Sequence, residues 1–423
     1  MRSALLSLVL ALSVLAGLSL AQETQRGRIK SFDAGKGVVT IATPDGKEVS
    51  AALTPQSMVR NASNQDIANF KQQGLPAGTT VNFRVKESNG RTELVGLKVA
   101  GQAAAQKGGG QRSGASAPAA PRDSIGVKPL TELGNEKYKG ETGGLYGNGS
   151  NDPPREQQEA AKKAAAKIQP LDAGGKPSPS GKIVLLSVGM SNTTQEFSVF
   201  KRLADSDPQK SDKLVIVDGA QGGQASEQWV DPTSETGKRV WGTVDQRLKA
   251  ADVSPEQVQV VWIKQALIQQ GRFGEFPEHA KKLQSDLTAI LQQLKRHFPN
   301  LQLAYMSSRI YAGYATTALN PEPYAYEGAF SVRWVIDAQV KGDPKLNCDA
   351  ARGHVNAPVV LWGPYLWGDG TTPRKDGLVW TKDDLSDRDG THPSDSGRQK
   401  VAEMLLKFFH SDPYAKGWYR REG

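Results

Sequence analysis

Short apolar runs alternate with amphipathic stretches over residues 182–410. The runs are continuous, as in strands buried on both faces, and lie at residues 183–188, 214–217, 258–263, 301–306 and 359–362. Apolar residues repeat at helical spacing at Leu283, Leu287, Ile290, Leu291 and Leu294, and again at Val401, Leu405 and Phe408. Strands that alternate with helices predict a parallel sheet covered on both faces. We therefore expect a three-layer α/β/α domain whose ligands bind beyond the carboxyl ends of the strands.

Residues 24–100 have a different pattern, made of short strands and tight turns. Strands are expected at residues 27–30, 37–42, 80–86 and 93–99, with turns at residues 44–46 and 89–90. Such closely spaced strands predict a small all-β closed barrel, and the pattern resembles OB-like modules without any signature residue. The aromatic residues are few, mainly Phe32, Phe70 and Phe83, which argues against a stacking platform for nucleic acid.

The first 21 residues have the pattern of a secretion signal. Arg2 precedes an apolar run from Ala4 to Leu20, and small residues stand at Ser19 and Ala21. We expect cleavage after Ala21. The alternative is an uncleaved membrane anchor, for which the run is short against the ~20 residues that a span needs. The pattern predicts a secreted or periplasmic protein without a membrane anchor after cleavage.

Changes of composition divide the rest of the chain. Residues 101–122 are rich in Ala, Gly, Gln, Ser and Pro, which is typical of a flexible linker. Residues 123–180 are polar and rich in turns, with one Ala-rich helical stretch near 155–168, and are expected to wrap onto the next domain as a lead-in segment. The predicted organisation is a signal peptide (1–21), a barrel (22–100), a linker (101–122), a lead-in segment (123–180) and an α/β domain (181–415).

Charge and cysteine content narrow the classes of function. The formal net charge is +9, but it is spread along the chain without a basic arm, so we expect no nucleic-acid partner. The single cysteine, Cys348, leaves no internal disulfide. The histidines show no zinc-type spacing, so we expect no metal and no cofactor. The oligomeric state stays open.

Two short motifs at opposite ends of the α/β domain carry side chains suited to nucleophilic catalysis. The motif GMSN at residues 189–192 follows the first apolar run and places Ser191 at a strand-to-loop junction. Asp389 precedes His392 by three residues just before the last helix, so its carboxylate can orient the imidazole. Each motif alone is more typical of a helix cap. Together they favour a serine nucleophile with a histidine base.

The order of these motifs resembles the sequence blocks of SGNH hydrolases, also called GDSL esterases. The blocks are GMSN, a Gly-rich loop at residues 218–223 and the sequence DGTH at residues 389–392. GMSN is similar to the GQSN start of carbohydrate acetylesterases. The resemblance covers residues 182–410 and implies an SGNH-type, flavodoxin-like sheet. It also implies Ser191 as nucleophile, Asp389 and His392 as the base pair, and the N–H groups of Ser191 and Gly222 as oxyanion donors.

The third block departs from the pattern of many family members, which have an Asn after a Gly. This chain reads WIKQA at residues 262–266. Carbohydrate acetylesterases have a tryptophan followed shortly by a glutamine, and that resemblance implies Gln265 as a further oxyanion donor. The alternative alignment directs Lys264 towards the pocket.

Aromatic loops at the predicted carboxyl edge suggest where a substrate binds. We take Tyr311 and Tyr314, together with Asn192, as candidate substrate-binding residues, although large loops also bury aromatic rings for packing. The predicted function is a secreted serine esterase that deacetylates a carbohydrate or cell-wall polysaccharide. One alternative is an SGNH-fold protein that has lost catalysis and binds glycans. Another is a protein whose barrel is the functional part.

Overall fold

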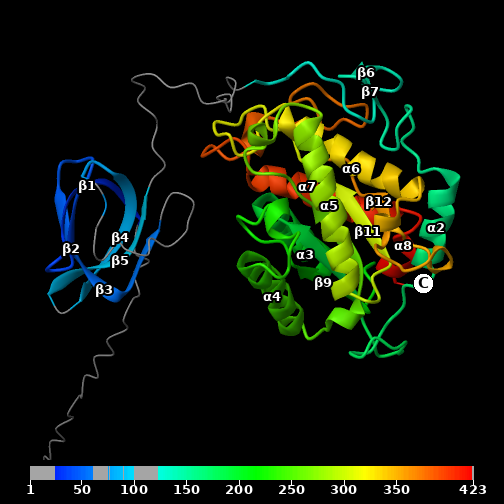
Figure 1. The fold of residues 1–423 in the computed structure, drawn as a ribbon, viewed down its shortest axis with the longest axis horizontal. Coiled ribbons are helices and arrows are strands. Elements are labelled where there is room, and N and C mark those ends of the chain that lie inside the picture. Colours follow the sequence, from blue (N-terminus) through cyan, green and yellow to red (C-terminus); the bar gives the residue numbers. More distant parts are fainter. Residues whose placement is uncertain (1–23, 61–74, 76, 89, 100–121, 422–423) are drawn as a thin grey trace, which may run out of the picture. The chain divides into compact units, whose positions relative to one another are not determined.

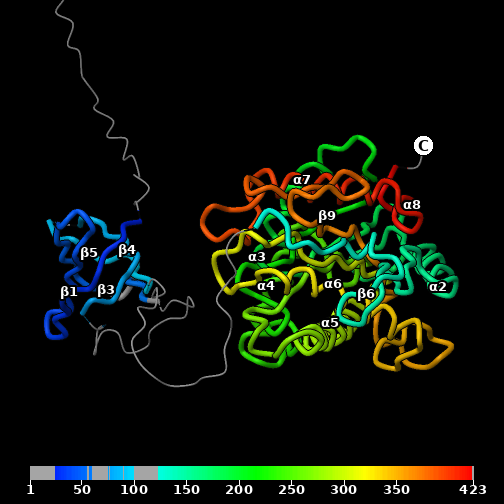
Figure 2. The backbone as a smooth tube through the Cα atoms, turned by 90° about the horizontal axis from the view of Figure 1, so that it is seen from above, coloured from blue at the N-terminus to red at the C-terminus, as the bar shows by residue number. Residues whose placement is uncertain are grey.

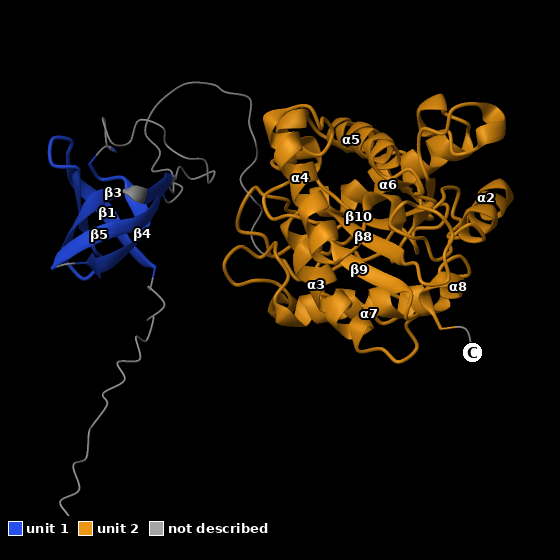
Figure 3. Cartoon of the chain, turned by 90° about the horizontal axis from the view of Figure 1, so that it is seen from below, with its two compact units in different colours: residues 1–111 blue, residues 112–423 orange. Residues whose placement is uncertain are grey.

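The computed structural model describes residues 24–60, 75, 77–88, 90–99 and 122–421 (Figure 1). The chain forms two compact units, residues 1–111 and 112–423. Figure 2 traces the backbone path, and Figure 3 colours the two units. The predicted signal peptide and residues 101–121 of the predicted linker lie outside the described residues. Within the described ranges, no helix has the length and apolar character needed to cross a membrane.

The first unit contains a closed β-barrel, which confirms the all-β expectation. Its strands are β1 (Gln25–Asp33), β2 (Val38–Ala42), β3 (Glu48–Arg60), β4 (Thr80–Ser88) and β5 (Arg91–Val99), in the order β1-β2-β3-β5-β4. The β3–β5 pair is parallel and the other pairs are antiparallel. Alternate side chains fill the interior, among them Ile29, Val39, Ile41, Val81 and Phe83.

The second unit is built on a parallel sheet with the strand order β12-β11-β10-β8-β9. The strands are β8 (Ile183–Gly189), β9 (Leu214–Asp218), β10 (Val258–Lys264), β11 (Leu303–Ser307) and β12 (Val359–Trp362). Every residue of β8, β10, β11 and β12 is buried, which explains their continuous apolar sequences. The chain places β9 on one side of β8 and then places β10, β11 and β12 on the other side, so the order of addition reverses between β8 and β10. In sheets of this kind ligands bind at that switch point.

Helices cover both faces of the sheet (Figure 3). Helices α4 (Glu235–Ala250), α5 (Glu278–His297) and α6 (Tyr324–Val340) lie on one face, and α3 (Ser191–Asp205) and α7 (Asp395–Ser411) on the other. The predicted three-layer α/β/α fold is therefore confirmed. The other elements are α2 (Arg155–Ala165), α8 (Lys416–Tyr419), β6 (Lys137–Tyr138), β7 (Glu141–Thr142) and short 3-10 helices at Ser226–Gln228, Pro255–Gln257, Gln270–Phe273, Pro344–Leu346, Ala350–Arg352 and Lys382–Asp384.

The apolar stripes that predicted the helices face the core. The five Leu and Ile positions of α5 are all buried, as the spacing predicts. In α7, Val401 and Leu405 are buried, but the third core residue is Phe409 rather than Phe408. Phe408 is half-buried and packs its ring against Tyr305. The helix therefore turns a slightly different face to the sheet than the simple spacing suggests.

Residues 122–154 run over the second unit and are fastened to it by side-chain hydrogen bonds. Asp369 accepts hydrogen bonds from the Ser124 hydroxyl and from the backbone N–H of Ile125. The β6–β7 hairpin contacts α6 through Tyr138 and Lys139, which both donate to the carboxylate of Glu327. This segment thus adds to the α/β domain at the edge where the loops after the strands lie.

Candidate active site

Ser191 lies at the carboxyl edge of the sheet, as the first residue of α3 and two residues after the end of β8. Its hydroxyl oxygen lies 2.7 Å from Nε2 of His392. The side chain is only half-buried, so a substrate can approach it. A hydroxyl at a helix N-terminus also faces the positive end of the helix dipole, which favours negative charge.

His392 is in turn oriented by Asp389. The Nδ1 atom of the imidazole lies 2.8 Å from Oδ2 of Asp389. The other carboxylate oxygen accepts the backbone N–H groups of Thr391 and His392 at 3.0 and 2.9 Å. Burial acts to raise the pKa of Asp389, but these hydrogen bonds outweigh it and hold that pKa well below its ordinary value. The carboxylate therefore stays ionised at neutral pH, and the three residues form a hydrogen-bonded Ser-His-Asp chain.

Residues 389–392, called the base loop below, carry His392 and are held in place by contacts with several other segments. The carbonyl of Asp389 accepts the N–H of Thr316 at 3.0 Å. Gly390 has a φ of +60°, and a Cβ at this position would overlap the carbonyl oxygen of Tyr314, so the turn requires glycine. The amide of Asn192 donates to the carbonyl of Thr391 at 2.9 Å. These contacts join the base loop to the residue that directly follows the nucleophile.

Gly222 lies next to the nucleophile. A Cβ built on Gly222 would stand 4.0 Å from the Cβ of Ser191, so the two backbones approach closely. The preceding residue, Gln221, donates its N–H to the carbonyl of Gly189 at 3.0 Å. Arg247 on α4 fastens the same loop by donating to the carbonyls of Asp218 and Ala220. These contacts hold the backbone of Gly222 beside Ser191, and the role of its N–H as an oxyanion donor stays a prediction.

The structure separates the environments of Lys264 and Gln265. The ammonium of Lys264 pairs with Glu196 on α3, and both side chains are fully buried. Burial lowers the pKa of Lys264 to about 8, although Glu196 opposes that shift. Gln265 is 3% exposed, and within the described ranges neither atom of its amide has a hydrogen-bond partner.

The register of the sheet brings Gln265 to the nucleophile's end of β8. Lys264 is aligned with Gly189, so the chain leaves β10 at the level where β8 gives way to Ser191. A buried amide without a hydrogen-bond partner destabilises the folded state unless a ligand supplies that partner. Lys264 is engaged by Glu196, whereas the Gln265 amide has no partner in the described part of the chain, and contact of either side chain with a substrate stays a prediction.

The three residues taken as candidate substrate contacts are buried, and each has a protein partner. Asn192 holds the base loop through Thr391, as described above. The hydroxyl of Tyr311 donates to the carbonyl of Arg122, and that of Tyr314 donates to the carboxylate of Asp123, both at 2.7 Å. Both tyrosines thus fasten the start of the lead-in segment. Contact of these residues with a substrate stays a prediction.

Arg309 contacts the base loop but was not among the site residues predicted from the sequence. Arg309, two residues beyond the end of β11, is 2% exposed and donates from Nη2 to the carbonyl of Thr391 at 3.0 Å. Its only signal in the sequence is a cation directly beyond an apolar run, at the edge where the site was expected. That signal is too common to single the residue out.

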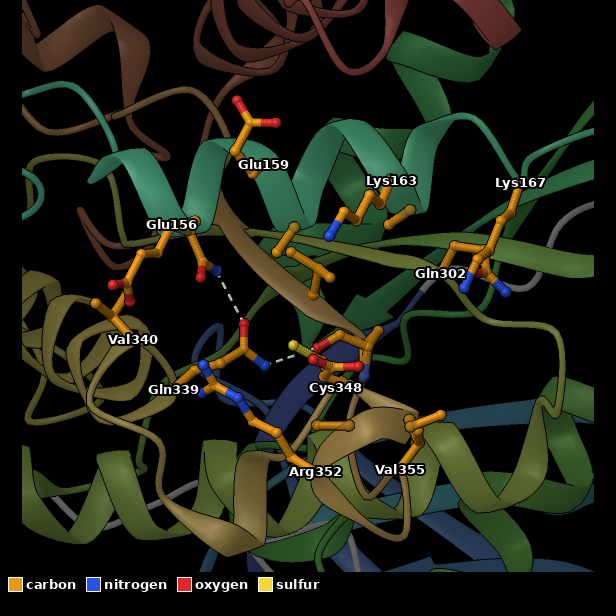
Figure 4. Close-up of a pocket in the computed structure, with 18 of the residues that line it drawn as sticks. Glu156, Glu159, Lys163, Lys167, Gln302, Gln339, Val340, Cys348, Arg352 and Val355 are labelled. Atoms are coloured by element: carbon orange, nitrogen blue, oxygen red, sulfur yellow. Dashed lines mark hydrogen bonds between the residues drawn. The ribbon is translucent and has the colours of Figure 1, made fainter.

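A cavity of about 540 Å³ lies away from these residues, between α2 and the segment before β12 (Figure 4). Gln302 and Val359, near the amino ends of β11 and β12, are among its lining residues. Cys348 also lines it, and burial raises the pKa of this thiol. None of the predicted site residues is among the lining residues, so the cavity is separate from the Ser-His-Asp chain.

No protein-family model matches the chain, and neither does any curated protein. Among solved structures, the chain is similar to a putative SGNH hydrolase from Slackia heliotrinireducens, at 15% identity over 54% of this chain and 99% of that one, with a TM-score of 0.28. It is also similar to a salicylyl-acyltransferase from a tetracycline biosynthetic pathway, at 14% identity over 56% of each chain, with a TM-score of 0.31. A third likeness is to apo-CusF residues 6–88 from Escherichia coli, at 18% identity over 21% of this chain and 100% of that one, with a TM-score of 0.15. At these values the likenesses carry no conclusion about reaction or substrate.

Proposed function

We propose that this protein is a serine esterase of the SGNH kind, with Ser191 as nucleophile. The observation that carries the proposal is the hydrogen-bonded chain from Ser191 through His392 to Asp389. His392 removes the hydroxyl proton as Oγ attacks the carbonyl carbon of an ester. It then gives that proton to the departing alcohol, which leaves an acyl-enzyme. Water, activated by the same imidazole, attacks the acyl carbon and releases the acid.

The negative charge that develops on the ester oxygen needs donors that are already in place. The backbone N–H groups of Ser191 and Gly222 and the side-chain amide of Gln265 are suited to that role. Gln265 fits because its amide is buried and has no partner among the described side chains and backbone. Donors that are fixed before the reaction stabilise the transition state without further reorganisation.

We further propose that the substrate is an acetylated carbohydrate or cell-wall polysaccharide outside the cytoplasm. Several accessible residues that neighbour the site residues along the chain are small or polar, namely Thr194, Gly223, Gln224, Thr316 and Arg388. A polar rim suits an alcohol rich in hydroxyl groups better than a lipid. The secretion-signal pattern of the first 21 residues supports the location.

A chain-length series of esters tests this substrate class. We expect p-nitrophenyl acetate to be hydrolysed faster than the butyrate and octanoate esters, and we expect acetate release from chemically acetylated xylan. A preference for octanoate with no release of acetate from the polysaccharide would contradict the substrate class but leave the esterase chemistry standing.

The rate of hydrolysis should depend on whether the imidazole of His392 is protonated. We expect kcat/KM to fall between pH 8 and pH 5, because the imidazole of His392 must be neutral to accept the hydroxyl proton of Ser191. The pKa of Asp389 is lowered, so its carboxylate stays charged throughout this window and does not contribute to the fall. A stopped-assay profile from pH 5 to 8 measures this, and a flat profile would reject His392 as the base.

Removal of the barrel should leave the esterase intact. We expect a chain that begins at residue 112 to keep the activity of the whole protein, since the two units are separately compact. The start must precede Arg122, because the backbone N–H of Arg122 donates to Gly313 and its carbonyl accepts from Tyr311. A folded but inactive fragment would show that the barrel contributes to the site.

A further inference from the structure

Arg309 is a buried cation whose burial is not explained by a contribution to the stability of the fold. Its side chain is 2% exposed, and none of the described carboxylates forms an ion pair with it. Its Nε atom has no hydrogen-bond partner in the described part of the chain. Burying a guanidinium without a paired carboxylate costs free energy. A cost of this kind at the edge of a catalytic site points to a role in function.

The main contact of Arg309 is a carbonyl that two side chains share. The oxygen of Thr391 accepts from Nη2 of Arg309 at 3.0 Å and from the amide of Asn192 at 2.9 Å. Asn192 directly follows the nucleophile, and Thr391 directly precedes the base. The two halves of the Ser-His pair therefore meet at this one oxygen, and Arg309 binds it from a third element, the segment after β11.

Arg309 stays protonated although it is buried. Burial lowers its pKa to about 10, so it is still a cation at neutral pH, and Glu196, Glu322 and Asp389 attract it from a distance. Glu196 is already bound by Lys264. Glu322 accepts hydrogen bonds from the indole of Trp367 and from two backbone N–H groups. With these carboxylates engaged elsewhere, the guanidinium directs its hydrogen bond to the base loop.

We propose that Arg309 is a positioning residue for the catalytic base. Through the Thr391 carbonyl it holds the imidazole of His392 at hydrogen-bonding distance from Ser191. The inference rests on the proposed esterase function, and it predicts an effect on turnover rather than on substrate affinity. Misplacement of a catalytic group by about 1 Å can cost on the order of 10²-fold in rate.

Substitution of Arg309 by Met and by Lys tests the idea. Methionine keeps the length and loses both the charge and the donors, so Arg309→Met should lower kcat about 10- to 100-fold with little change in KM. Lysine keeps a charged donor, so Arg309→Lys should lie between the wild type and the Met variant. Wild-type kcat in a folded Arg309→Met protein would overturn the proposal. If that variant does not fold, wild-type kcat in a folded Arg309→Gln protein, whose side chain is shorter and uncharged, would do so.

Arg333 supplies a matched control. It is 5% exposed, pairs with Glu141 and donates to the carbonyl of Thr142 in the β6–β7 hairpin. Arg333→Met should therefore lower the melting temperature and leave kcat unchanged. An equal loss of kcat in both Met variants would mean that Arg309 acts only through general stability, which contradicts a positioning role.

A readout that needs no turnover separates this inference from the esterase proposal. The Nδ1 proton of His392, bonded to Asp389, should give a downfield proton NMR signal that disappears in His392→Gln. We expect this signal in the wild type, in Arg309→Lys and in Arg333→Met, and its broadening or loss in Arg309→Met. A protein that shows this pattern but hydrolyses no ester refutes the esterase and retains Arg309 as a positioning residue. An unchanged signal in Arg309→Met refutes the positioning role whatever the activity.

Discussion

Ser191→Ala is expected to abolish hydrolysis of a chromogenic acetate ester while the fold stays intact. The hydroxyl that His392 contacts at 2.7 Å is the proposed nucleophile, and no acyl-enzyme can form without it. Loss of the serine in comparable enzymes costs on the order of 10⁶ in kcat. Alanine keeps the Cβ and suits the helical conformation at the start of α3, so the melting temperature should change little. Initial-rate measurements on the purified variant give the result directly.

Ser198 provides the control on the same helix. It is exposed, and its hydroxyl donates to the carbonyl of Gln195 within α3. Ser198→Ala should therefore hydrolyse the ester at the wild-type rate. Equal turnover in Ser191→Ala and the wild type would refute the esterase proposal outright.

The second large effect is expected at Gln265. Gln265→Ala should lower kcat by about 10² to 10³, or ~2.7 to 4 kcal/mol, with little change in KM, because an oxyanion donor acts on charge that appears only in the transition state. The stability of the variant should change less than for most buried polar residues, since no described hydrogen bond of the amide is lost. Steady-state kinetics and thermal unfolding on one preparation separate the two effects.

Lys264, the neighbouring residue, should show the opposite pattern. Lys264→Ala leaves the fully buried carboxylate of Glu196 without its partner, which costs about 3 to 5 kcal/mol of stability. Its effect should therefore appear in the unfolding midpoint, and the double substitution Lys264→Met with Glu196→Leu should recover much of the loss. A large fall in kcat for Lys264→Met/Glu196→Leu with none for Gln265→Ala would reverse the assignment of the third donor.

The strands of the α/β domain could be predicted because they are buried on both faces. A strand of this kind has no exposed face, so most of its residues are apolar and it stands out between amphipathic helices. The barrel was harder to predict in detail. Strand β3 was not located from the sequence, since Pro55 and the polar residues around it interrupt the alternation, and its pairing with β5 shifts register between Leu53 and Met58.

The candidate site shows a similar division. Ser191, Asp389 and His392 carry local motifs, and the structure brings them together at hydrogen-bonding distances. The pair Lys264 and Glu196 joins residues 68 positions apart, and Arg309 meets Thr391 across 82 positions. Contacts of this kind depend on which strand ends lie side by side. Single-residue patterns do not encode that information, so these contacts emerge only from the fold.

The most direct test of the nucleophile is covalent labelling of the folded protein with a fluorophosphonate, followed by digestion and mass spectrometry. An activated serine attacks the phosphorus, loses its proton to the histidine and displaces fluoride, so one stable adduct forms per active site. The proposed chemistry predicts that this adduct maps to Ser191 and is absent from both Ser191→Ala and His392→Gln. No adduct on the folded wild-type protein, or an adduct on a different residue that persists in Ser191→Ala, would contradict it.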